Sequence, residues 1–215
     1  MYKEFEAWLT WRYVRMTDSN ERALDRIPGL TTKENYLSQS EHDELLRQID
    51  GQIWITDLKR RVQHYGYRYD YKSRSVDPSM YLGPLPAWAT PLAKRLHHDG
   101  WIAAVPDQLI VNEYEPGQGI ASHIDCIPCF GDTIISLTLG SSCVMTFTSI
   151  KTREEIPVLL EPRGLIVMRD ESRYAWKHGI APRKTEIFQG ATIKRGRRVS
   201  LTFRNILKEG TESPQ

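Results

Sequence analysis

The sequence lacks the features that mark membrane and secreted proteins. No apolar run approaches the roughly 18 residues that a helical membrane span requires. The first residues include acids and contain no long apolar stretch, which excludes a signal peptide. The chain has only three cysteines, and this odd number is not typical of a disulfide framework. We therefore expect a protein of the reducing cytoplasm, or of the nucleus in a eukaryote, with no membrane partner.

A strong charge of one sign is also lacking. The formal net charge is +2 and the isoelectric point lies near 8.4. This balance is too mild to indicate nucleic-acid binding, so such a function has to rest on local clusters of charge. With 215 residues, 40% of them hydrophobic, the chain is long enough for one domain with a full core. The sequence contains no internal repeat or low-complexity linker, and we expect a monomer.

Helical patterns come first along the chain. Apolar residues at helical spacing in residues 2–16 predict an amphipathic helix within an N-terminal extension, residues 1–26. A capping box at residues 38–41 opens a second predicted helix, which runs to Ile49. A third helix is expected between residues 86 and 100, since Pro and Gly stand at its two ends.

Short strand patterns dominate after Gly100. Turn residues separate the expected strands, which are Leu109–Tyr114, Thr133–Leu139, Val144–Thr148, Ile156–Leu160, Leu165–Met168 and Val199–Phe203. Helices followed by many short strands predict a mainly β fold with flanking helices, in which two sheets form a sandwich. We expect the main domain at residues 27–207 and a C-terminal tail at residues 208–215.

A possible metal site follows the first of these strands. His123 and Asp125 are separated by one residue, and alternate residues of an extended segment share a face. A later histidine, His178, could complete a set of two imidazoles and one carboxylate. Such a set leaves three positions of Fe(II) open for a bidentate 2-oxo acid and dioxygen. Alone the pattern is weak, because His-x-Asp also occurs by chance and the chain has six histidines.

The last expected strand offers a site for a dicarboxylate. Residues 198–204 alternate strictly, so that Arg198, Ser200, Thr202 and Arg204 share one face. Guanidinium groups bind carboxylates in a bidentate manner, which suits 2-oxoglutarate. Asn112 and Tyr114 likewise share a face of their own strand. A solvent-exposed strand face explains the two arginines equally well at this stage.

Six motifs then occur in the order and spacing of a known family. They are Asn112-Glu113-Tyr114 with Pro116-Gly117, His123-x-Asp125, Ile135-Ser136-Leu137-x-Leu139-Gly140, Glu171-Ser172-Arg173, His178-Gly179-Ile180 and Arg198-x-Ser200-Leu201-Thr202-Phe203-Arg204. From about Ile27 to Leu207 the chain resembles the AlkB family of Fe(II)- and 2-oxoglutarate-dependent dioxygenases.

The resemblance carries specific expectations. It implies a double-stranded β-helix (jelly-roll) core, and Fe(II) with 2-oxoglutarate and dioxygen as co-substrates. Its iron ligands would be His123, Asp125 and His178. Its co-substrate residues would be Asn112, Tyr114, Arg198 and Ser200, with Arg204 near the metal and Asp125.

One branch of the family is most similar in its motifs. Residues 114–120 and 171–174 resemble the AlkB-like domain of the tRNA wobble-uridine hydroxylases. The chain has no room for the RNA-recognition and methyltransferase domains that flank it in the multi-domain enzymes. The bacterial repair enzymes carry an acid two positions after the metal aspartate, where this chain has Ile127. Repair-type base recognition therefore does not follow from the resemblance.

Residues 59–74, the lid segment, interleave basic residues with tyrosines at every second position from Tyr65 to Tyr71. Cations suit phosphates, and aromatic faces suit unstacked bases. The segment resembles the nucleotide-recognition lid of AlkB-like proteins, although an exposed hairpin rich in tyrosine is the plainer alternative. The predicted substrate-binding residues are Arg60, Arg61, Tyr65, Tyr67, Arg74 and Arg173.

A pair of cysteines, Cys126 and Cys129, follows the metal aspartate. Redox pairing or zinc binding is conceivable, but a zinc site needs two more ligands and a thioredoxin-like context is absent. The favoured interpretation is a loop beside the iron site.

The function expected from the sequence is oxidation of an alkylated or modified nucleobase in DNA or RNA, by demethylation or by hydroxylation of a side chain. The same chemistry on a protein side chain or a small molecule is the alternative. A binding module without activity is a third hypothesis, but it has no need of the metal triad and both arginines.

Overall fold

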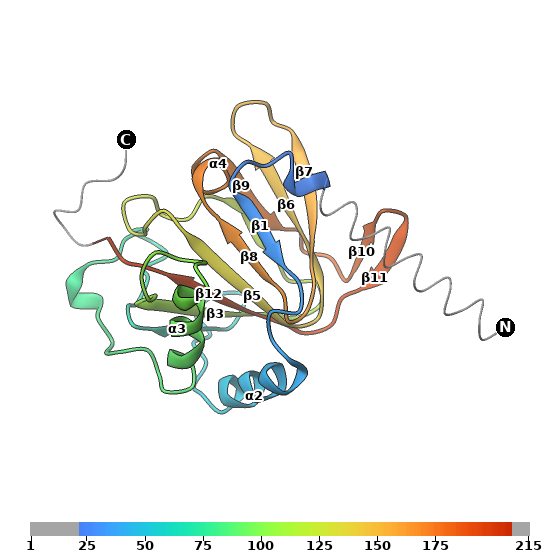
Figure 1. The fold of residues 1–215 in the computed structure, drawn as a ribbon. Coiled ribbons are helices and arrows are strands. Elements are labelled where there is room, and N and C mark those ends of the chain that lie inside the picture. The colour runs from blue at the N-terminus through green and yellow to red at the C-terminus, as the bar shows by residue number, and fades with distance from the viewer. Residues whose placement is uncertain (1–21, 208–215) are drawn as a thin grey trace.

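Two antiparallel sheets face each other in the computed structural model, which describes residues 22–207 (Figure 1). The six-stranded sheet has the order β1-β8-β5-β12-β3-β2, and the four-stranded sheet has the order β4-β9-β6-β7. The first sheet comprises β1 (Leu30–Lys33), β2 (Val62–Tyr65), β3 (Gln108–Tyr114), β5 (Ile134–Gly140), β8 (Leu165–Met168) and β12 (Arg198–Arg204). The second comprises β4 (Ile120–His123), β6 (Cys143–Ser149), β7 (Glu155–Leu160) and β9 (Trp176–Ile180).

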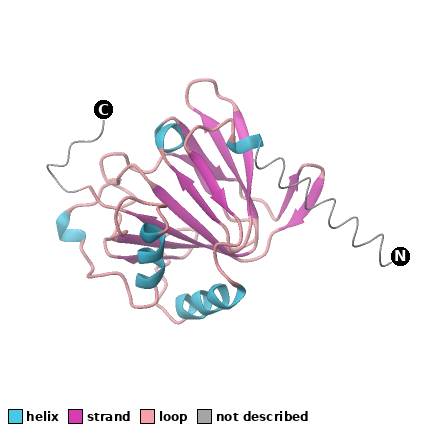
Figure 2. Cartoon of the chain, viewed as in Figure 1, coloured by secondary structure: helices cyan, strands magenta, loops and turns pink. Residues whose placement is uncertain are grey.

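The arrangement is the jelly roll that the sequence predicted, with helices on the outside (Figure 2). A separate hairpin is formed by β10 (Thr185–Phe188) and β11 (Ala191–Lys194). The helical elements are α2 (Gln39–Asp50), α3 (Thr90–His98), the short α4 (Asp170–Tyr174) and the 3-10 turn Pro78–Met80. No helix within residues 22–207 is long and apolar enough to cross a membrane. The helix expected at residues 2–16 and the tail at 208–215 lie outside the described residues.

The alternation in β12 determines where the core and the cavity lie. Val199, Leu201 and Phe203 are fully buried in a cluster with apolar residues of α2 and α3. These helices therefore cover the outer face of the six-stranded sheet, because their apolar stripes pack on it. The opposite face of β12, which carries Arg198 and Arg204, points between the two sheets. A second apolar cluster, which includes Phe147 of β6, fills the rest of that space.

Local signals explain both long helices. At the start of α2 the hydroxyl of Ser38 accepts a hydrogen bond from the backbone N–H of Glu41, and the Glu41 carboxylate accepts one from the backbone N–H of Ser38. This is the expected capping box. Helix α3 ends shortly before Gly100, whose φ of +77° favours glycine. Both helices were predicted within a few residues.

All six strands expected from the sequence are present within a residue or two of their predicted bounds. The remaining strands, β1, β2, β4, β9, β10 and β11, were not predicted. They have four or five residues each and mixed burial, and β4 and β9 carry polar residues that serve the site. A short strand without clean alternation gives little signal in the sequence.

Candidate iron and 2-oxoglutarate site

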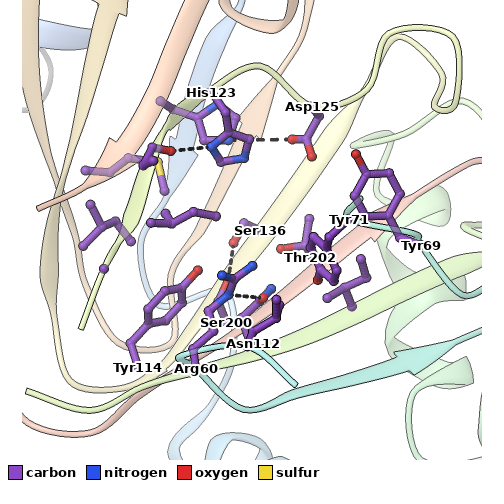
Figure 3. A pocket seen from close by; sticks show the side chains of 18 of the residues that line it. Arg60, Tyr69, Tyr71, Asn112, Tyr114, His123, Asp125, Ser136, Ser200 and Thr202 are labelled. Carbon is purple, nitrogen blue, oxygen red and sulfur yellow. Dashed lines mark hydrogen bonds and ion pairs between the residues drawn. The ribbon is translucent and has the colours of Figure 1, made fainter. Parts of the chain in front are cut away.

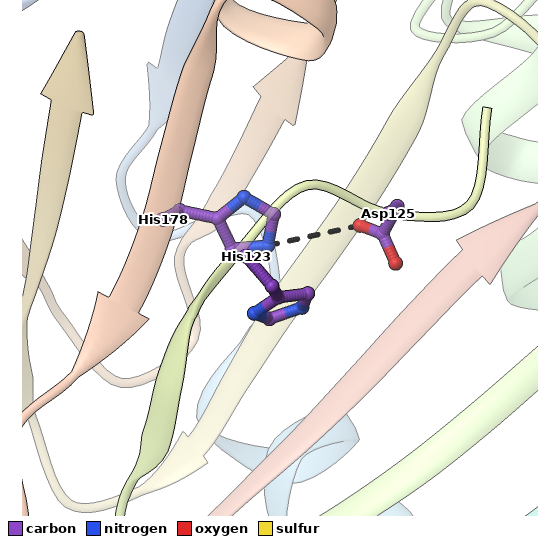
Figure 4. A group of neighbouring side chains, drawn as sticks. All are labelled: His123, Asp125 and His178. Carbon is purple, nitrogen blue, oxygen red and sulfur yellow. Dashed lines mark ion pairs between the residues drawn. The ribbon is translucent and has the colours of Figure 1, made fainter. Parts of the chain in front are cut away.

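Three potential metal ligands meet where β4 and β9 pair. His123 ends β4 and lies opposite His178 of β9, and Asp125 follows in the loop after β4. One ligand atom from each residue lies within 4.8 Å of the others. The Nε2 atom of His178 is 3.7 Å from Oδ2 of Asp125 (Figure 4). The structure thus brings together the triad that the sequence singled out.

The backbone around the triad accounts for this close approach. A Cβ atom on Gly179 would lie 2.9 Å from the backbone of Ser122, so only glycine allows β4 and β9 to come so near. The Nδ1 atom of His123 is 2.8 Å from the carbonyl oxygen of Ala121. Because a carbonyl only accepts, Nδ1–H donates, and the lone pair of Nε2 is left for a metal.

The protonation states fit a divalent cation. Burial by itself raises the pKa of Asp125. The charge of Arg204, with smaller contributions from His178 and His123, outweighs burial and holds the pKa of Asp125 at about 2. The Nη1 atom of Arg204 donates to Oδ1 of Asp125 over 2.8 Å. Burial, reinforced by His123, lowers the pKa of His178 to about 4. At neutral pH the pair is therefore a carboxylate and a neutral imidazole, which are the forms that bind metal.

Arg173 holds the loop that carries Asp125 through hydrogen bonds to its backbone. This side chain is only 2% exposed and donates to the backbone carbonyl groups of Asp125, Cys126, Phe130 and Gly131. The sequence predicted Arg173 at the substrate. In the structure Arg173 does not line the cavity. Its buried guanidinium needs hydrogen-bond acceptors, and the four carbonyl groups of the loop supply them.

A cavity of about 470 Å³ opens between the sheets, and the triad lines it (Figure 3). Besides the three possible metal ligands, its lining includes these predicted residues: Arg60, Arg74, Asn112, Tyr114, Arg198, Ser200 and Arg204. Within the described part of the chain, Arg61, Tyr65, Tyr67 and Arg173 do not line it.

The inner end of the cavity suits a dicarboxylate. Arg198 is 3% exposed, and its Nη2 atom donates to Oγ1 of Thr138 over 2.9 Å. Its Nε atom is buried and has no hydrogen-bond partner among the described residues. A buried guanidinium without a carboxylate partner favours an anionic ligand, because an unpaired buried charge is costly. The alternative of a solvent-exposed strand face is excluded for both Arg198 and Arg204.

Two hydroxyl residues of this subsite were missed. Ser136 and Thr138 stand opposite β12 on β5, and Oγ of Ser136 lies 2.9 Å from Oγ of Ser200. Their signal was present in the sequence, because they alternate with apolar residues in Ile134–Gly140 just as Ser200 and Thr202 do in β12.

Comparison with known proteins agrees with this geometry. The model of the 2OG-Fe(II) oxygenase superfamily matches residues 29–204. The chain belongs to this superfamily. It is an AlkB-like dioxygenase, and its cofactor and co-substrates are Fe(II), 2-oxoglutarate and dioxygen.

Similar proteins extend the comparison. The chain is 41% identical to the mouse (Mus musculus) "tRNA (carboxymethyluridine(34)-5-O)-methyltransferase ALKBH8" over 93% of this chain and 34% of that protein. It is 36% identical to "Uncharacterized protein L905" of Acanthamoeba polyphaga mimivirus, over 85% of this chain and 87% of the viral one. It is also 36% identical to the "Alkylated DNA repair protein ALKBH8 homolog" of Arabidopsis thaliana, over 84% of this chain and 59% of that protein. The dioxygenase thus spans about a third of the mouse relative.

Solved structures share the fold. OsALKBH1 superposes with a TM-score of 0.60 at 20% identity, covering 83% of this chain and 97% of the other. A Pseudomonas putida prolyl-4-hydroxylase gives 0.53 at 15% identity, covering 86% and 98%.

The tyrosines of the lid segment do not share a face in the dioxygenase. Gly66 has a φ of +76°, and a Cβ there would lie 1.8 Å from the carbonyl oxygen of Asp107. This turn breaks the alternation, so Tyr65 packs edge-on against Trp88 with ring centroids 5.4 Å apart. Tyr67 packs against Tyr81 at 5.0 Å. Neither side chain reaches the cavity.

The two tyrosines that follow in the lid segment do reach the cavity. Tyr69 and Tyr71 line the cavity and pack edge-to-face, with centroids 5.0 Å apart (Figure 3). Arg60 lies beside them, 5.5 Å from the Tyr71 centroid, and its Nε atom donates to Oδ1 of Asn112 over 2.9 Å. Arg61 instead pairs with Glu113 on the far side of β3. The partners of the two arginines, Asn112 and Glu113, are consecutive in β3 and point to its opposite faces, which separates the two arginines.

Proposed function

We propose that this dioxygenase oxidises a modified or alkylated nucleobase in DNA or RNA. The observation that carries the proposal is that part of the lid segment lines the cavity that also holds the metal triad and the two buried arginines of β12. The lining residues of the segment include Arg60, Tyr69, Tyr71 and Arg74. Stacking rings and cations around a small cavity are what an extruded base with its phosphate requires.

The inner residues would bind the iron and the co-substrate. His123, Asp125 and His178 would hold Fe(II), and Arg198 would pair with the distal carboxylate of 2-oxoglutarate. Bound together with dioxygen, they supply oxidative decarboxylation of 2-oxoglutarate to succinate and hydroxylation of a substrate C–H bond. Arg204 keeps Asp125 ionised and directed toward the metal position.

The outer residues would bind the base. Tyr71 offers an aromatic surface, and its ring lies beneath the guanidinium of Arg60. Since Arg60 also contacts Asn112, it links the lid segment to the co-substrate subsite. A hydroxylated N-methyl group would leave as formaldehyde, whereas a hydroxylated carbon substituent would stay on the base. The cavity volume of about 470 Å³ is within the range of small-molecule sites.

The names of the relatives support a nucleic acid as the substrate. The mouse protein is named for a modified uridine of tRNA, and the Arabidopsis protein for repair of alkylated DNA. Similarity to the prolyl-4-hydroxylase is one of fold alone and favours no protein substrate.

Mass spectrometry of digested nucleic acid tests the proposal. Bulk tRNA and methylated DNA or RNA oligomers would be incubated with the protein, Fe(II), 2-oxoglutarate and ascorbate. We expect a hydroxylated or demethylated nucleoside that is absent with the Arg198→Ala variant. If no nucleoside changes while succinate is still formed, the substrate is not a nucleobase, and the hydroxylase of a protein or small molecule becomes the better account.

A further inference from the structure

Three exposed cations surround the turn that joins β3 to β4, residues 115–119. Lys59 begins the lid segment, and it also lines the cavity. Arg183 and Lys184 lie between β9 and the β10–β11 hairpin, which projects from the sandwich (Figure 1). The turn itself contains one acid, Glu115. We call Lys59, Arg183 and Lys184 the basic shelf.

The turn holds the three cations of the shelf together. The side-chain amide of Gln118 donates to the carbonyl oxygen of Lys59 over 2.7 Å. The backbone N–H of Gly117 donates to the carbonyl oxygen of Arg183 over 3.0 Å. The side chain of Lys184 lies on Gly117, since a Cβ atom there would be 3.7 Å from its Cγ and Cε atoms. Segments far apart in the sequence are therefore fixed on one turn.

A buried ion pair supports the turn from the side of the hairpin. Arg195 is 6% exposed and pairs with Glu186, which is 3% exposed. Its Nη1 atom donates to the carbonyl oxygen of Gln118 over 3.1 Å and to that of Ala181 over 2.7 Å. One buried guanidinium thus joins the turn to the chain that leads to Arg183. A surface held in place before binding loses less conformational freedom when a ligand arrives.

The cations of the shelf have no acidic partners. Within residues 22–207, Lys59, Arg183 and Lys184 form no ion pair. Exposed arginines elsewhere do pair, as Arg26 does with an acid of the β6–β7 turn and Arg47 with one of its own helix. Neighbouring cations without acids attract anions, so the shelf suits a ligand with several negative charges.

The shelf adjoins the cavity through the end of the same turn. Gly119 and Ile120 line the cavity. A Cβ atom on Gly119 would lie 2.1 Å from the carbonyl oxygen of Ile180, so the chain leading to Arg183 runs directly against this part of the lining. A base that enters the cavity leaves its phosphates outside, because a phosphate is costly to remove from water. The phosphates of such a strand would meet cations at the shelf.

We propose that Lys59, Arg183 and Lys184 bind backbone phosphates of the nucleic-acid strand that carries the target base. The substrate is then a polynucleotide, because a free nucleoside lacks the groups that the shelf recognises. The inference rests on the proposed nucleobase function and adds to it a strand-binding surface outside the cavity. Contacts to phosphate position a strand without reading its sequence, so the shelf serves RNA or DNA by the same chemistry.

The double variant R183Q/K184Q removes two charges of the shelf and leaves the cavity lining unchanged. Each phosphate contact with a single strand contributes about 0.7 to the slope of log affinity against log salt concentration, so the slope should become shallower by about 1.4. Between about 50 and about 200 mM salt, the affinity of the natural protein should therefore fall about sevenfold more than that of the variant. Succinate formation without substrate should be equal in the two proteins.

Fluorescence anisotropy with labelled single-stranded oligonucleotides tests the inference. The full chain, loaded with iron and 2-oxoglutarate and kept free of dioxygen, would be titrated with RNA and with DNA of one mixed sequence at several salt concentrations. We expect the shallower slope for R183Q/K184Q, with an unchanged Tm. The strand that the natural protein binds more tightly identifies the nucleic acid that the shelf serves.

The matched control is K151Q/R153Q, which removes the same charge from exposed residues of the β6–β7 turn. It should keep the slope of the natural protein. The inference is overturned if R183Q/K184Q also keeps that slope, or if both double variants change it equally, since the effect would then be one of net charge. An oxidised nucleoside in digested tRNA together with an unchanged slope would remove the shelf and keep the proposed function. A shallower slope without any oxidised nucleoside would keep the shelf and remove the nucleobase chemistry.

Discussion

Arg198→Lys keeps the positive charge of the co-substrate subsite and removes the bidentate geometry of the guanidinium. In the structure one Nη atom of Arg198 is engaged by Thr138, and the side chain is almost completely buried. Its free Nε edge is what a carboxylate would occupy. Lysine keeps the positive charge, but its ammonium cannot maintain the contact with Thr138 and also offer two parallel donors to a carboxylate. One charge-assisted hydrogen bond should be lost, which amounts to about 1.5–3 kcal/mol.

This energy corresponds to a rise of roughly 10- to 150-fold in the KM for 2-oxoglutarate. Succinate formation measured against 2-oxoglutarate concentration checks it, and Tm reports that the variant is folded. Arg47→Lys, on the exposed face of α2, is the matched control and should leave KM unchanged. A KM for Arg198→Lys within twofold of the natural value would show that another residue holds the distal carboxylate.

Three further predictions concern the metal, the strand pairing and the base. His123→Ala should abolish succinate formation with little change in Tm, and residual turnover near the natural rate would contradict the iron assignment. Gly179→Ala places a methyl group 2.9 Å from the Ser122 backbone, so it should lower the free energy of unfolding by about 1–3 kcal/mol and weaken iron binding, as measured by denaturation and metal titration. Tyr71→Ala should weaken oligonucleotide binding by about 1–3 kcal/mol, whereas Tyr67→Ala should not; equal effects would place the base elsewhere.

The sequence was most informative where alternation and function coincide. In β12 the pattern alone separates the core face from the face with Arg198 and Arg204, because a strand between a core and a cavity must alternate. His123 and Asp125 were likewise predicted correctly to lie together, since only one residue separates them in the sequence. The family motifs supplied His178, which no local pattern links to the other two.

The orientation of the lid tyrosines and the role of Arg173 were not predicted, because they depend on one turn and on one buried charge. The left-handed turn at Gly66 interrupts the alternation of the tyrosines, and a Cβ at this position would clash with the carbonyl oxygen of Asp107. Arg173 was predicted at the substrate, and its family motif, Glu171-Ser172-Arg173, carries no sign of burial. Only the folded loop shows that carbonyl groups surround it. Cys126 and Cys129 form a disulfide in that loop, where the sequence had favoured a plain loop over paired cysteines.

The ratio of succinate to oxidised nucleoside tests the central claim most directly. With an excess of an oligonucleotide that the enzyme accepts, both products would be quantified in one reaction by mass spectrometry. The account predicts that they accumulate in equal amounts and that both disappear in His123→Ala. Succinate that forms without any oxidised nucleoside, across modified DNA and RNA, would contradict the claim that a nucleobase occupies this cavity.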